Sequence, residues 1–378
     1  MNICFIHSVD LTVDSAPSIH VREIVKNLAV KNNIFLLVDR GDPSENIKVF
    51  PINIPKIKGF TYLFTVFCSF IVLKNLIDKN KIEIIYCRDI FSSFSAILLS
   101  KMKKIPFVFE VNGILSDEAK IKKQNGLYIF LIKIFERFVF RNADALICVT
   151  ENIKRYIESE YNRKNIYCVP NGVNTDLFKP IKNAKKFLKL DENYFYVGFI
   201  GSFKPWQGLN ILIKSAPEIV KNIPNVKFLL VGDGIEKKKL IKIIEELNLQ
   251  KYFILTGRIP YEEVPNYINA CDVCTIPKLS LKSGYSPLKL YEYMVCEKSV
   301  IASKIGGFEI LEQNNAGILV EPKNPEELSR AIIKLLKNEE LRKEMGKNGR
   351  KYVVENHSWK KIAERIEEIC FKIVGESK

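Results

Sequence analysis

Apolar residues along the chain follow two alternating spacings. Short runs of β-branched and aromatic residues predict buried strands, and in the first half these are NICFIHS, IFLLVDR, IEIIYCRD, PFVFEVNG and DALICVT. Between them, segments such as IHVREIVKNLAVK and LYIFLIKIFERFVFRNA repeat their apolar residues with the 3.6-residue period of a helix. This strand–helix alternation predicts a parallel sheet with helices on both faces.

The same alternation starts again after NGVNTDLFKP. Its second set of strands is YVGFIGS, VKFLLVGDG, YFILTGR, CDVCTIP, SVIAS and GILVEP. Between the two sets lies a Lys-rich, Pro-containing stretch, 180–189, and no apolar period returns before Tyr194. A chain of 378 residues also exceeds the size at which one hydrophobic core usually keeps growing. We therefore expect an α/β protein with two consecutive doubly wound, Rossmann-like domains, 1–180 and 181–359.

Composition and charge narrow the class of protein. A hydrophobic content of 47% with 27% charged residues is typical of a folded globular chain. The net charge is +15, and residues 1–185 carry 27 Lys and Arg against 18 Asp and Glu. This excess favours an anionic partner such as a membrane surface or a phosphorylated substrate, although a codon bias toward lysine explains it equally well. No dense basic run with interleaved aromatics is present, so we expect no nucleic-acid partner.

Cysteine usage and the N-terminal segment bear on location. Nine cysteines are scattered singly through apolar segments, as in reduced cytosolic proteins. Cys271 and Cys274 form a CxxC without a second pair or a nearby histidine, which favours a buried strand over a zinc site. MNICFIHSVD lacks the layout of a signal peptide, and the longest uncharged run, 59–73, is too short to span a bilayer comfortably. We expect a cytoplasmic protein.

Glycines and polar residues gather immediately after the predicted strands. In doubly wound sheets, ligands bind outside the carboxyl ends of the strands. This placement predicts an enzyme that acts on two substrates, one in each domain. The residues concerned are Ser8, Arg88, Asn112, Gly113, Gly201, Ser202, Gly232, Gly234, Gly257 and Arg258.

The segment SGYSPLKLYEY contains a predicted helix start. Ser286 supplies a capping hydroxyl and Pro287 suits the first helical position. The free amides and positive dipole of such a start attract phosphate. Lys289 lies in the first turn, where a cation is unfavourable without a bound anion, and Glu292, three residues on, can accept hydrogen bonds from a ribose diol. A surface pair between Lys289 and Glu292 explains the same residues, so both interpretations stay open here.

Eight segments, taken in order, extend over nearly the whole chain: SIHVREIVKNLA, FVFEVNG, VPNGVNTDLFKP, IGSFKPWQGLNILIKSAPEI, VKFLLVGDG, TGRIPYEEVPNYINACDVCTIP, SPLKLYEYMVCEKSVIASKIGGFEIL and HSWKKIAERIEEI. Together they resemble glycosyltransferase family 4, which are retaining enzymes of the GT-B fold, and SPLKLYEY is similar to one subgroup's variant of the donor motif. The resemblance implies two Rossmann-like domains facing each other across a cleft. It further implies that 1–180 binds the acceptor and is joined by a C-terminal helix, 360–378, while 181–359 binds the nucleotide sugar.

The resemblance also implies where the donor is held. Glu292 occupies the position of the second glutamate of the family's Glu-x7-Glu motif, which binds the ribose of the nucleotide. Gly284 replaces the first glutamate, so backbone amides and Ser283 or Ser286 are expected to hold the sugar, whose identity stays open.

Cationic contacts to the diphosphate are expected from Lys204 and Lys289, which we place among the catalytic residues. Ser202 and Gln207 stand where many relatives have an arginine and a lysine, so these contacts depart from the common pattern. The expected donor-binding set is Gly201, Ser202, Gln207, Gly232, Gly257, Arg258, Ser283, Gly284, Ser286, Pro287, Leu288 and Glu292.

On the acceptor side, the resemblance points to four residues and to one catalytic residue. Ser18 is expected to cap the first helix, and His20 to meet phosphate or acceptor hydroxyls unless its role is structural. Arg88 and Glu110 are expected to shape the acceptor pocket, or else to form a structural ion pair. Asn112 replaces a histidine that touches the donor sugar; its amide can hydrogen-bond a hydroxyl but cannot shuttle a proton, so it is not a general base.

The function that the resemblance implies is a hexosyltransferase-type, retaining glycosyltransferase. It would move a sugar from a nucleotide-diphosphate sugar to a glycan or lipid-linked acceptor in cell-surface polysaccharide or glycan assembly. Front-side attack with the leaving diphosphate taking the acceptor's proton needs no metal and no cofactor, and Asp233 in VGDG is interpreted as a turn residue. The apolar, partly basic segment NGLYIFLIKIFERFVFRNA either packs under its own sheet or rests on the anionic inner face of a membrane.

Three alternatives remain. A catalytically silent GT-B binding subunit is compatible with the missing first glutamate, and a sugar-nucleotide epimerase would share the phosphate site. A nicotinamide oxidoreductase is disfavoured, because GDG is only a fragment of GxGxxG and the expected acidic residue has no counterpart.

Overall fold

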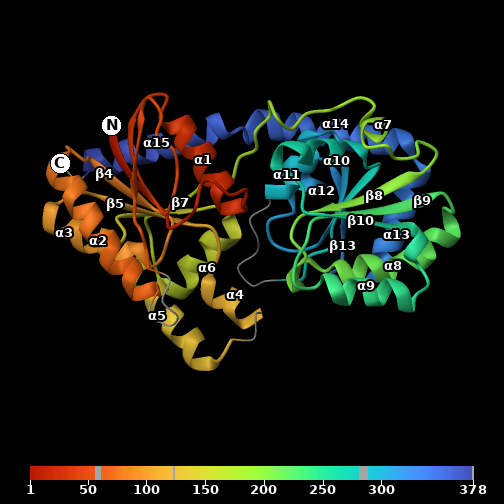
Figure 1. Cartoon of the computed structure of the whole chain (residues 1–378), viewed down its shortest axis with the longest axis horizontal. Helices are drawn as coiled ribbons and strands as arrows, with labels where there is room; N and C mark the ends of the chain where they lie inside the picture. Colours follow the sequence, from red (N-terminus) through yellow and green to blue (C-terminus); the bar gives the residue numbers. More distant parts are fainter. Residues whose placement is uncertain (56–60, 122–123, 281–287, 377–378) are drawn as a thin grey trace. The chain divides into compact units, whose positions relative to one another are not determined.

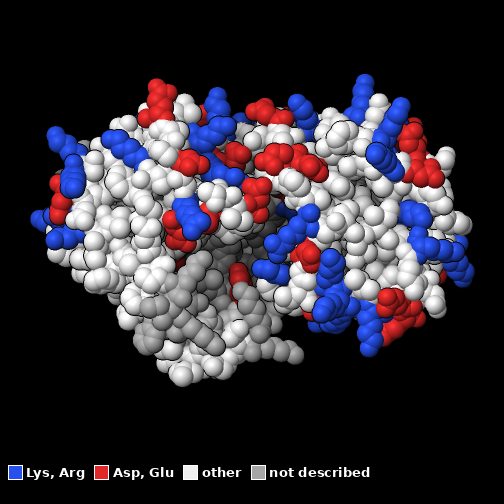
Figure 2. All heavy atoms as spheres, viewed as in Figure 1, with Lys and Arg blue, Asp and Glu red and all other residues white. Residues whose placement is uncertain are grey.

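The computed structural model describes residues 1–55, 61–121, 124–280 and 288–376. Contacts divide the chain into two compact units (Figure 1). Unit 1 is Met1–Asn171 with Trp359–Lys378, and unit 2 is Gly172–Ser358. Each unit contains one parallel sheet, which confirms the predicted α/β fold of two Rossmann-like domains. Lys and Arg are interspersed with Asp and Glu over much of both units (Figure 2).

The unit 1 sheet has the order β3-β2-β1-β4-β5-β6-β7. Its strands are β1 (Asn2–Ile6), β2 (Asn33–Val38), β3 (Ile47–Pro51), β4 (Ile84–Cys87), β5 (Phe107–Val111), β6 (Ala145–Cys148) and β7 (Ile166–Cys168). Its helices are α1 (Ala16–Leu28), α2 (Thr61–Lys79), α3 (Ser92–Lys103), α4 (Leu115–Ile121), α5 (Gly126–Asn142), α6 (Glu151–Tyr161) and α15 (Trp359–Glu376). In the described parts of the chain, no helix combines the length and apolarity needed to cross a membrane.

The helix α15 follows unit 2 in sequence but packs in unit 1, against α1. Seven of its side chains are buried. The Trp359 ring meets the His20 ring edge-on, with centroids 5.1 Å apart. Farther along, Glu367 accepts a hydrogen bond from Asn32 at 2.6 Å. The periodic apolar face of this helix therefore forms part of the unit 1 core.

The unit 2 sheet has the order β10-β9-β8-β11-β12-β13. Its strands are β8 (Phe195–Ile200), β9 (Val226–Val231), β10 (Phe253–Gly257), β11 (Val273–Ile276), β12 (Ser299–Ser303) and β13 (Gly317–Val320). Its helices are α7 (Ala184–Phe187), η1 (Pro205–Gln207), α8 (Leu209–Asn222), α9 (Lys237–Glu246), η2 (Gln250–Tyr252), η3 (Tyr261–Glu263), α10 (Val264–Ala270), α11 (Leu288–Val295), α12 (Ile310–Gln313), α13 (Pro325–Lys337) and α14 (Glu339–Asn356).

Two apolar clusters form the core of unit 2. One includes Leu290 of α11 and Val353 of α14, and the other includes Leu212 of α8 and Ile332 of α13. The strands between them are largely buried, as expected for a sheet covered on both faces. Cys274 lies buried within β11, and Cys271 is buried just before it.

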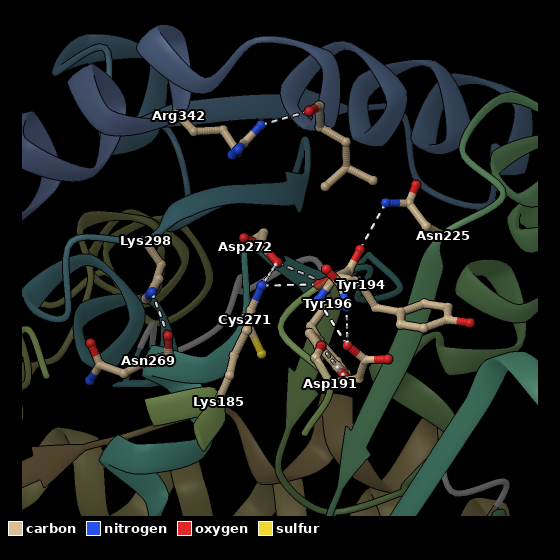
Figure 3. A network of polar contacts seen from close by, with 12 residues as sticks. Lys185, Asp191, Tyr194, Tyr196, Asn225, Asn269, Cys271, Asp272, Lys298 and Arg342 are labelled. Carbon is tan, nitrogen blue, oxygen red and sulfur yellow. Dashed lines mark hydrogen bonds and ion pairs between the residues drawn. The ribbon is translucent and has the colours of Figure 1, made fainter. Parts of the chain in front are cut away.

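A polar network closes the amino edge of this sheet, where β8 and β11 begin (Figure 3). Asp272 accepts hydrogen bonds from Lys185 Nζ at 2.9 Å and from the amide of Tyr196 at 2.8 Å. Lys185 also donates to the carbonyl of Tyr194 at 3.0 Å. The network fixes the linker helix α7 to the sheet and leaves the opposite, carboxyl edge for ligands.

Candidate functional site

The order of strands in unit 2 creates one switch point, between β8 and β11. From β8 the chain continues to β9 on one side, whereas β11 continues to β12 on the other. β8 leads directly into Gly201, and β11 leads through Pro277 into Lys278. In open parallel sheets, this is the position at which ligands bind.

Glycines allow the backbone segments at this edge to approach closely. Gly208 has φ +68°, and a Cβ there would lie 1.8 Å from the carbonyl oxygen of Pro277. Gly232 has φ +132°, and a Cβ there would lie 2.1 Å from the carbonyl oxygen of Gly201. Gly232 also bridges to Gly257. Three predicted donor-site glycines thus lie side by side: Gly201 follows β8, Gly232 follows β9 and Gly257 ends β10.

Lys289 projects from the first turn of α11 toward this edge. Its Nζ lies 4.0 Å from the centroid of the Phe199 ring and donates to Gln207 Oε1 at 3.3 Å. A Cβ on Gly201 would lie 2.6 Å from the same Nζ. Among the residues that the structure describes, no carboxylate lies within ion-pair distance of it.

The charge of Lys289 is poorly compensated. Burial lowers its pKa well below the usual range, and the positive charge of Lys278 lowers it further, whereas Glu292 opposes the shift. Lys278 is itself buried, with 7% of its surface exposed. Two neighbouring ammonium groups at a buried strand edge are stabilised by an anion between them. The sequence analysis identified Lys289 but not Lys278, although a polar residue just after a predicted strand was the signal used elsewhere.

Glu292 lies one turn farther along α11 and is half-buried. Burial raises its pKa to about 7, against the effects of Lys289 and of the Tyr261 hydroxyl. Tyr261 OH donates to Glu292 Oε1 at 3.4 Å. The Lys289–Glu292 pair is therefore more than ion-pair distance apart, and the carboxylate keeps acceptor capacity for a ligand.

Other predicted donor residues differ in their placement. Ser202, Lys204 and Arg258 are exposed, and Lys204 Nζ lies 5.1 Å from the centroid of the Trp206 ring. Leu288 is the first residue of α11 and is half-buried. The remaining predictions, Ser283, Gly284, Ser286 and Pro287, lie outside the described residues. Asp233 accepts from the Gly234 amide at 2.7 Å and from Lys237 Nζ at 3.3 Å, as a turn residue does.

Unit 1 has a corresponding switch point between β1 and β4. A hollow of about 650 Å³ opens there. Its polar lining comes from residues that follow four neighbouring strands: His7, Ser8, Asp10, Asp39, Arg40, Asn53, Arg88 and Asp89. Of these, the sequence analysis singled out Ser8 and Arg88. Asp39 and Arg40 are the last two residues of the predicted strand IFLLVDR, whereas Asn53 follows β3, which was not predicted.

Glu110 is the centre of a buried cluster beside the hollow. Its Oε1 lies 2.8 Å from His20 Nε2 and 3.1 Å from Arg88 Nε, and accepts from Asn112 Nδ2 at 2.7 Å. Its Oε2 accepts from Tyr86 OH at 2.6 Å. Burial alone would raise the pKa of Glu110, but His20 and Arg88 outweigh it and hold that pKa well below its usual range. The carboxylate therefore orients its neighbours. Arg88 and Glu110 were expected either to shape the acceptor pocket or to form a structural ion pair, and the structure shows the ion pair.

His20 and Ser18 lie on the first turns of α1 and are buried. Burial and then Arg88 lower the pKa of His20, whereas Glu110 opposes the shift. The prediction that Ser18 caps the helix is wrong, because α1 begins at Ala16 and Ser15 is its cap. Ser15 Oγ accepts from the Ser18 amide, while Ser18 Oγ donates to the Asp10 carbonyl at 2.9 Å. From the sequence alone, either Ser15 or Ser18 could be the cap of this helix.

Comparison with known proteins identifies the family. Residues 18–177 match the family described as Glycosyltransferase Family 4, and residues 180–352 match Glycosyl transferases group 1. An uncharacterized glycosyltransferase of Methanocaldococcus jannaschii is 30% identical over 356 residues, 93% of each chain. The chain belongs to the family 4 glycosyltransferases.

Solved structures share the fold of this glycosyltransferase. Sucrose-phosphate synthase from Thermosynechococcus elongatus superimposes with a TM-score of 0.87 at 20% identity over 99% of both chains. HepE of Anabaena in complex with UDP-glucose gives 0.76 at 19% identity, over 97% of this chain and 98% of that one. The GT-B fold and the family predicted from the sequence are thus confirmed, and the SPLKLYEY subgroup stays a prediction.

Proposed function

We propose that this glycosyltransferase takes its sugar from a nucleoside diphosphate sugar bound at the switch point of unit 2. One observation carries the proposal: among the described residues no carboxylate lies within ion-pair distance of the Lys289 ammonium group at the carboxyl edge of the sheet, and the positive charge of Lys278 acts on the same group. A diphosphate carries the negative charge that both lysines can bind. Glu292, one helical turn away, is placed to accept hydrogen bonds from the ribose diol. The UDP-glucose bound by HepE, a protein of the same fold, is a ligand of this class.

The acceptor is proposed to bind in the hollow of unit 1. Asp39 and Asp89 can accept hydrogen bonds from sugar hydroxyls, and Arg40 can donate to acceptor oxygens. The buried Glu110 cluster holds Arg88 and Asn112 in fixed orientations at the same strand edge. These groups suit a glycan or the sugar portion of a lipid-linked glycan, as used in cell-surface polysaccharide assembly.

The proposed reaction retains the configuration of the anomeric carbon. An acceptor hydroxyl attacks that carbon as its bond to the diphosphate oxygen breaks, and the hydroxyl proton passes to the leaving phosphate. Lys289 and Lys278 stabilise the negative charge that develops on the phosphate, with Lys204 on the neighbouring loop as a third cation. Ammonium groups in this position make a divalent ion unnecessary, so we propose a metal-independent reaction.

Ligand-induced thermal shifts test the donor site. UDP-, GDP-, ADP- and CDP-sugars are added to the full chain, and one nucleotide class is expected to raise the melting temperature. Lys289→Ala, Lys278→Ala and Glu292→Ala should each abolish that shift, whereas Lys242→Ala, an exposed lysine on α9, should preserve it. The stabilising sugar is then incubated in EDTA with candidate acceptors, and NMR of the product's anomeric proton reports retention or inversion.

Several outcomes contradict parts of the proposal. Unchanged shifts in the three site variants would show that the diphosphate binds elsewhere. A product of inverted configuration, or activity that disappears in EDTA and returns with Mg²⁺, would contradict the mechanism. Release of an epimerised nucleotide sugar without acceptor would favour the epimerase alternative.

A further inference from the structure

Unit 1 exposes an unusual number of large apolar side chains on three neighbouring helices. α3 lies between α2 and α5: Ser95 Oγ donates to the Val66 carbonyl of α2 at 2.6 Å, and Phe94 stacks on Phe138 of α5 at 4.8 Å. We call the following ten residues the apolar face; they are 39 to 68% exposed: Leu63, Phe67 and Ile71 on α2, Leu98 and Met102 on α3, and Leu127, Phe130, Leu131, Ile134 and Phe138 on α5. Monomeric proteins rarely leave contiguous apolar patches larger than a few hundred Å².

The spacing of these residues produces continuous stripes. On α2 and α3 they recur every four residues, and on α5 they follow the three- and four-residue steps of one helical face. Ile132 and Val139 of α5 are buried on its other side. The helix is therefore apolar on two sides, and packing against its own unit accounts for only one of them. Figure 2 shows a broad area without charged side chains where α2 runs along unit 1.

The charged residues on the same helices are almost all basic. Seven exposed cations lie on these helices: Lys74, Lys79, Lys101, Lys103, Lys133, Arg137 and Arg141. The helices contain two acidic residues. Glu136 is buried with 1% of its surface exposed, and Asp78 pairs with Lys103 at 2.6 Å. An apolar face with cations and almost no available carboxylate is complementary to an anionic lipid surface.

We propose that the apolar face docks on an anionic membrane, with its Leu, Phe and Ile side chains in the interfacial layer and its Lys and Arg side chains on lipid phosphates. A second copy of the chain is a poorer occupant. A twofold interface would bring the same cations from both copies together without carboxylates to pair them. Lysine is also depleted from protein–protein interfaces.

The hollow of unit 1 shares helices with this face. Thr65 of α2 and Leu115 of α4 line the hollow, and Phe91 lines it at the start of α3. A membrane on the apolar face would therefore lie against the same elements that form the proposed acceptor site. This second step rests on the proposed function, whereas docking itself does not.

Vesicle sedimentation of the full chain tests the docking. Binding is expected to vesicles of phosphatidylcholine with one third phosphatidylglycerol, to be weak with phosphatidylcholine alone, and to fall as salt screens the phosphates. Phe67→Gln/Phe130→Gln/Leu131→Gln should lower the vesicle partition coefficient at least tenfold. Phe187→Gln/Ile235→Gln, which changes apolar residues of unit 2 that are even more exposed, is the control and should bind as wild type. Far-UV circular dichroism and hydrogen exchange of the unit 1 strands show that each variant is folded.

Three results would overturn docking on a membrane. The first is no binding to the anionic vesicles, and the second is unchanged binding by the triple variant. The third is a dimer in light scattering that the triple variant dissociates, which would assign the face to a second copy. For the acceptor step, the triple variant should keep its activity on a water-soluble acceptor and lose it on the same acceptor anchored in vesicles. Loss on both would contradict that step alone.

Discussion

Lys289 and Glu292 lie one helical turn apart, and their surroundings bring their pKa values closer together than usual. Burial lowers the pKa of the lysine well below its ordinary range and raises that of the glutamate to about 7. Both groups are needed in their charged forms for the proposed donor site, since the ammonium binds phosphate and the carboxylate binds the ribose. Binding should therefore be strongest within a limited pH range.

Nucleotide-sugar affinity is expected to rise about tenfold between pH 6 and pH 8. At pH 6, only about one in ten Glu292 carboxyls with a pKa of about 7 is ionised, and at pH 8 most are. Above that range, affinity should fall as Lys289 loses its proton below the pH at which lysine usually does. Titrations followed by Trp206 fluorescence measure the affinity at each pH. The ligand is a nucleotide sugar because, unlike a free nucleoside diphosphate, it has no terminal phosphate that ionises in this pH range.

Two variants separate the limbs of that profile. Glu292→Gln should remove the rise between pH 6 and pH 8, and Lys289→Arg should move the alkaline fall to higher pH because guanidinium stays protonated. If Glu292→Gln kept the wild-type profile, some other group would control the acidic limb.

At the residue scale, sequence reasoning identified groups that stand next to strand ends and missed those whose role depends on packing. Lys289 and Glu292 belong to a recognisable local motif. Lys278 gains its significance only because β11 lies beside β8, a pairing between segments about 75 residues apart. The orientation of Glu110 toward both His20 and Arg88 likewise depends on three separate elements.

At the element scale, every strand inferred from an apolar run is present, and the two that were not inferred are edge strands. β3 and β7 close the ends of the unit 1 sheet and are partly exposed. An edge strand lacks a neighbour on one side, so its sequence need not be uniformly apolar. The periodicity of α5 correctly predicted a helix, but not that one of its apolar sides is exposed.

The network around Asp272 is expected to stabilise unit 2 without affecting donor binding. Asp272→Asn removes its charge from the ion pair with Lys185, in which both side chains are about one-fifth exposed. We expect unit 2 to lose about 1–3 kcal/mol of unfolding free energy, with unchanged nucleotide affinity because the network lies at the opposite strand edge. Urea unfolding in a Trp359→Phe background, in which Trp206 reports on unit 2 alone, measures the loss. A weakened nucleotide affinity under conditions in which the variant is fully folded would contradict this separation of roles.

At the scale of the whole molecule, unit 1 is assembled from both ends of the described chain. Removing residues 359–378 should unfold unit 1 and leave unit 2 folded. The four buried Ile and Val side chains of α15, Ile362, Ile366, Ile373 and Val374, contribute about 1.5–3 kcal/mol each, a sum comparable to the stability of a domain. Hydrogen exchange with mass spectrometry should show protection lost in β1 and β2 and kept in β8 and β9. Equal protection in both units would contradict a structural role for α15.

The return of α15 to unit 1 also bears on how the protein is made. On a translating ribosome, the first 171 residues emerge well before the helix that completes their core. At ordinary elongation rates the interval is on the order of 10–40 s. During that time the surface of α1 around His20 is bare on the nascent chain, which makes unit 1 a natural client for chaperones until α15 has emerged.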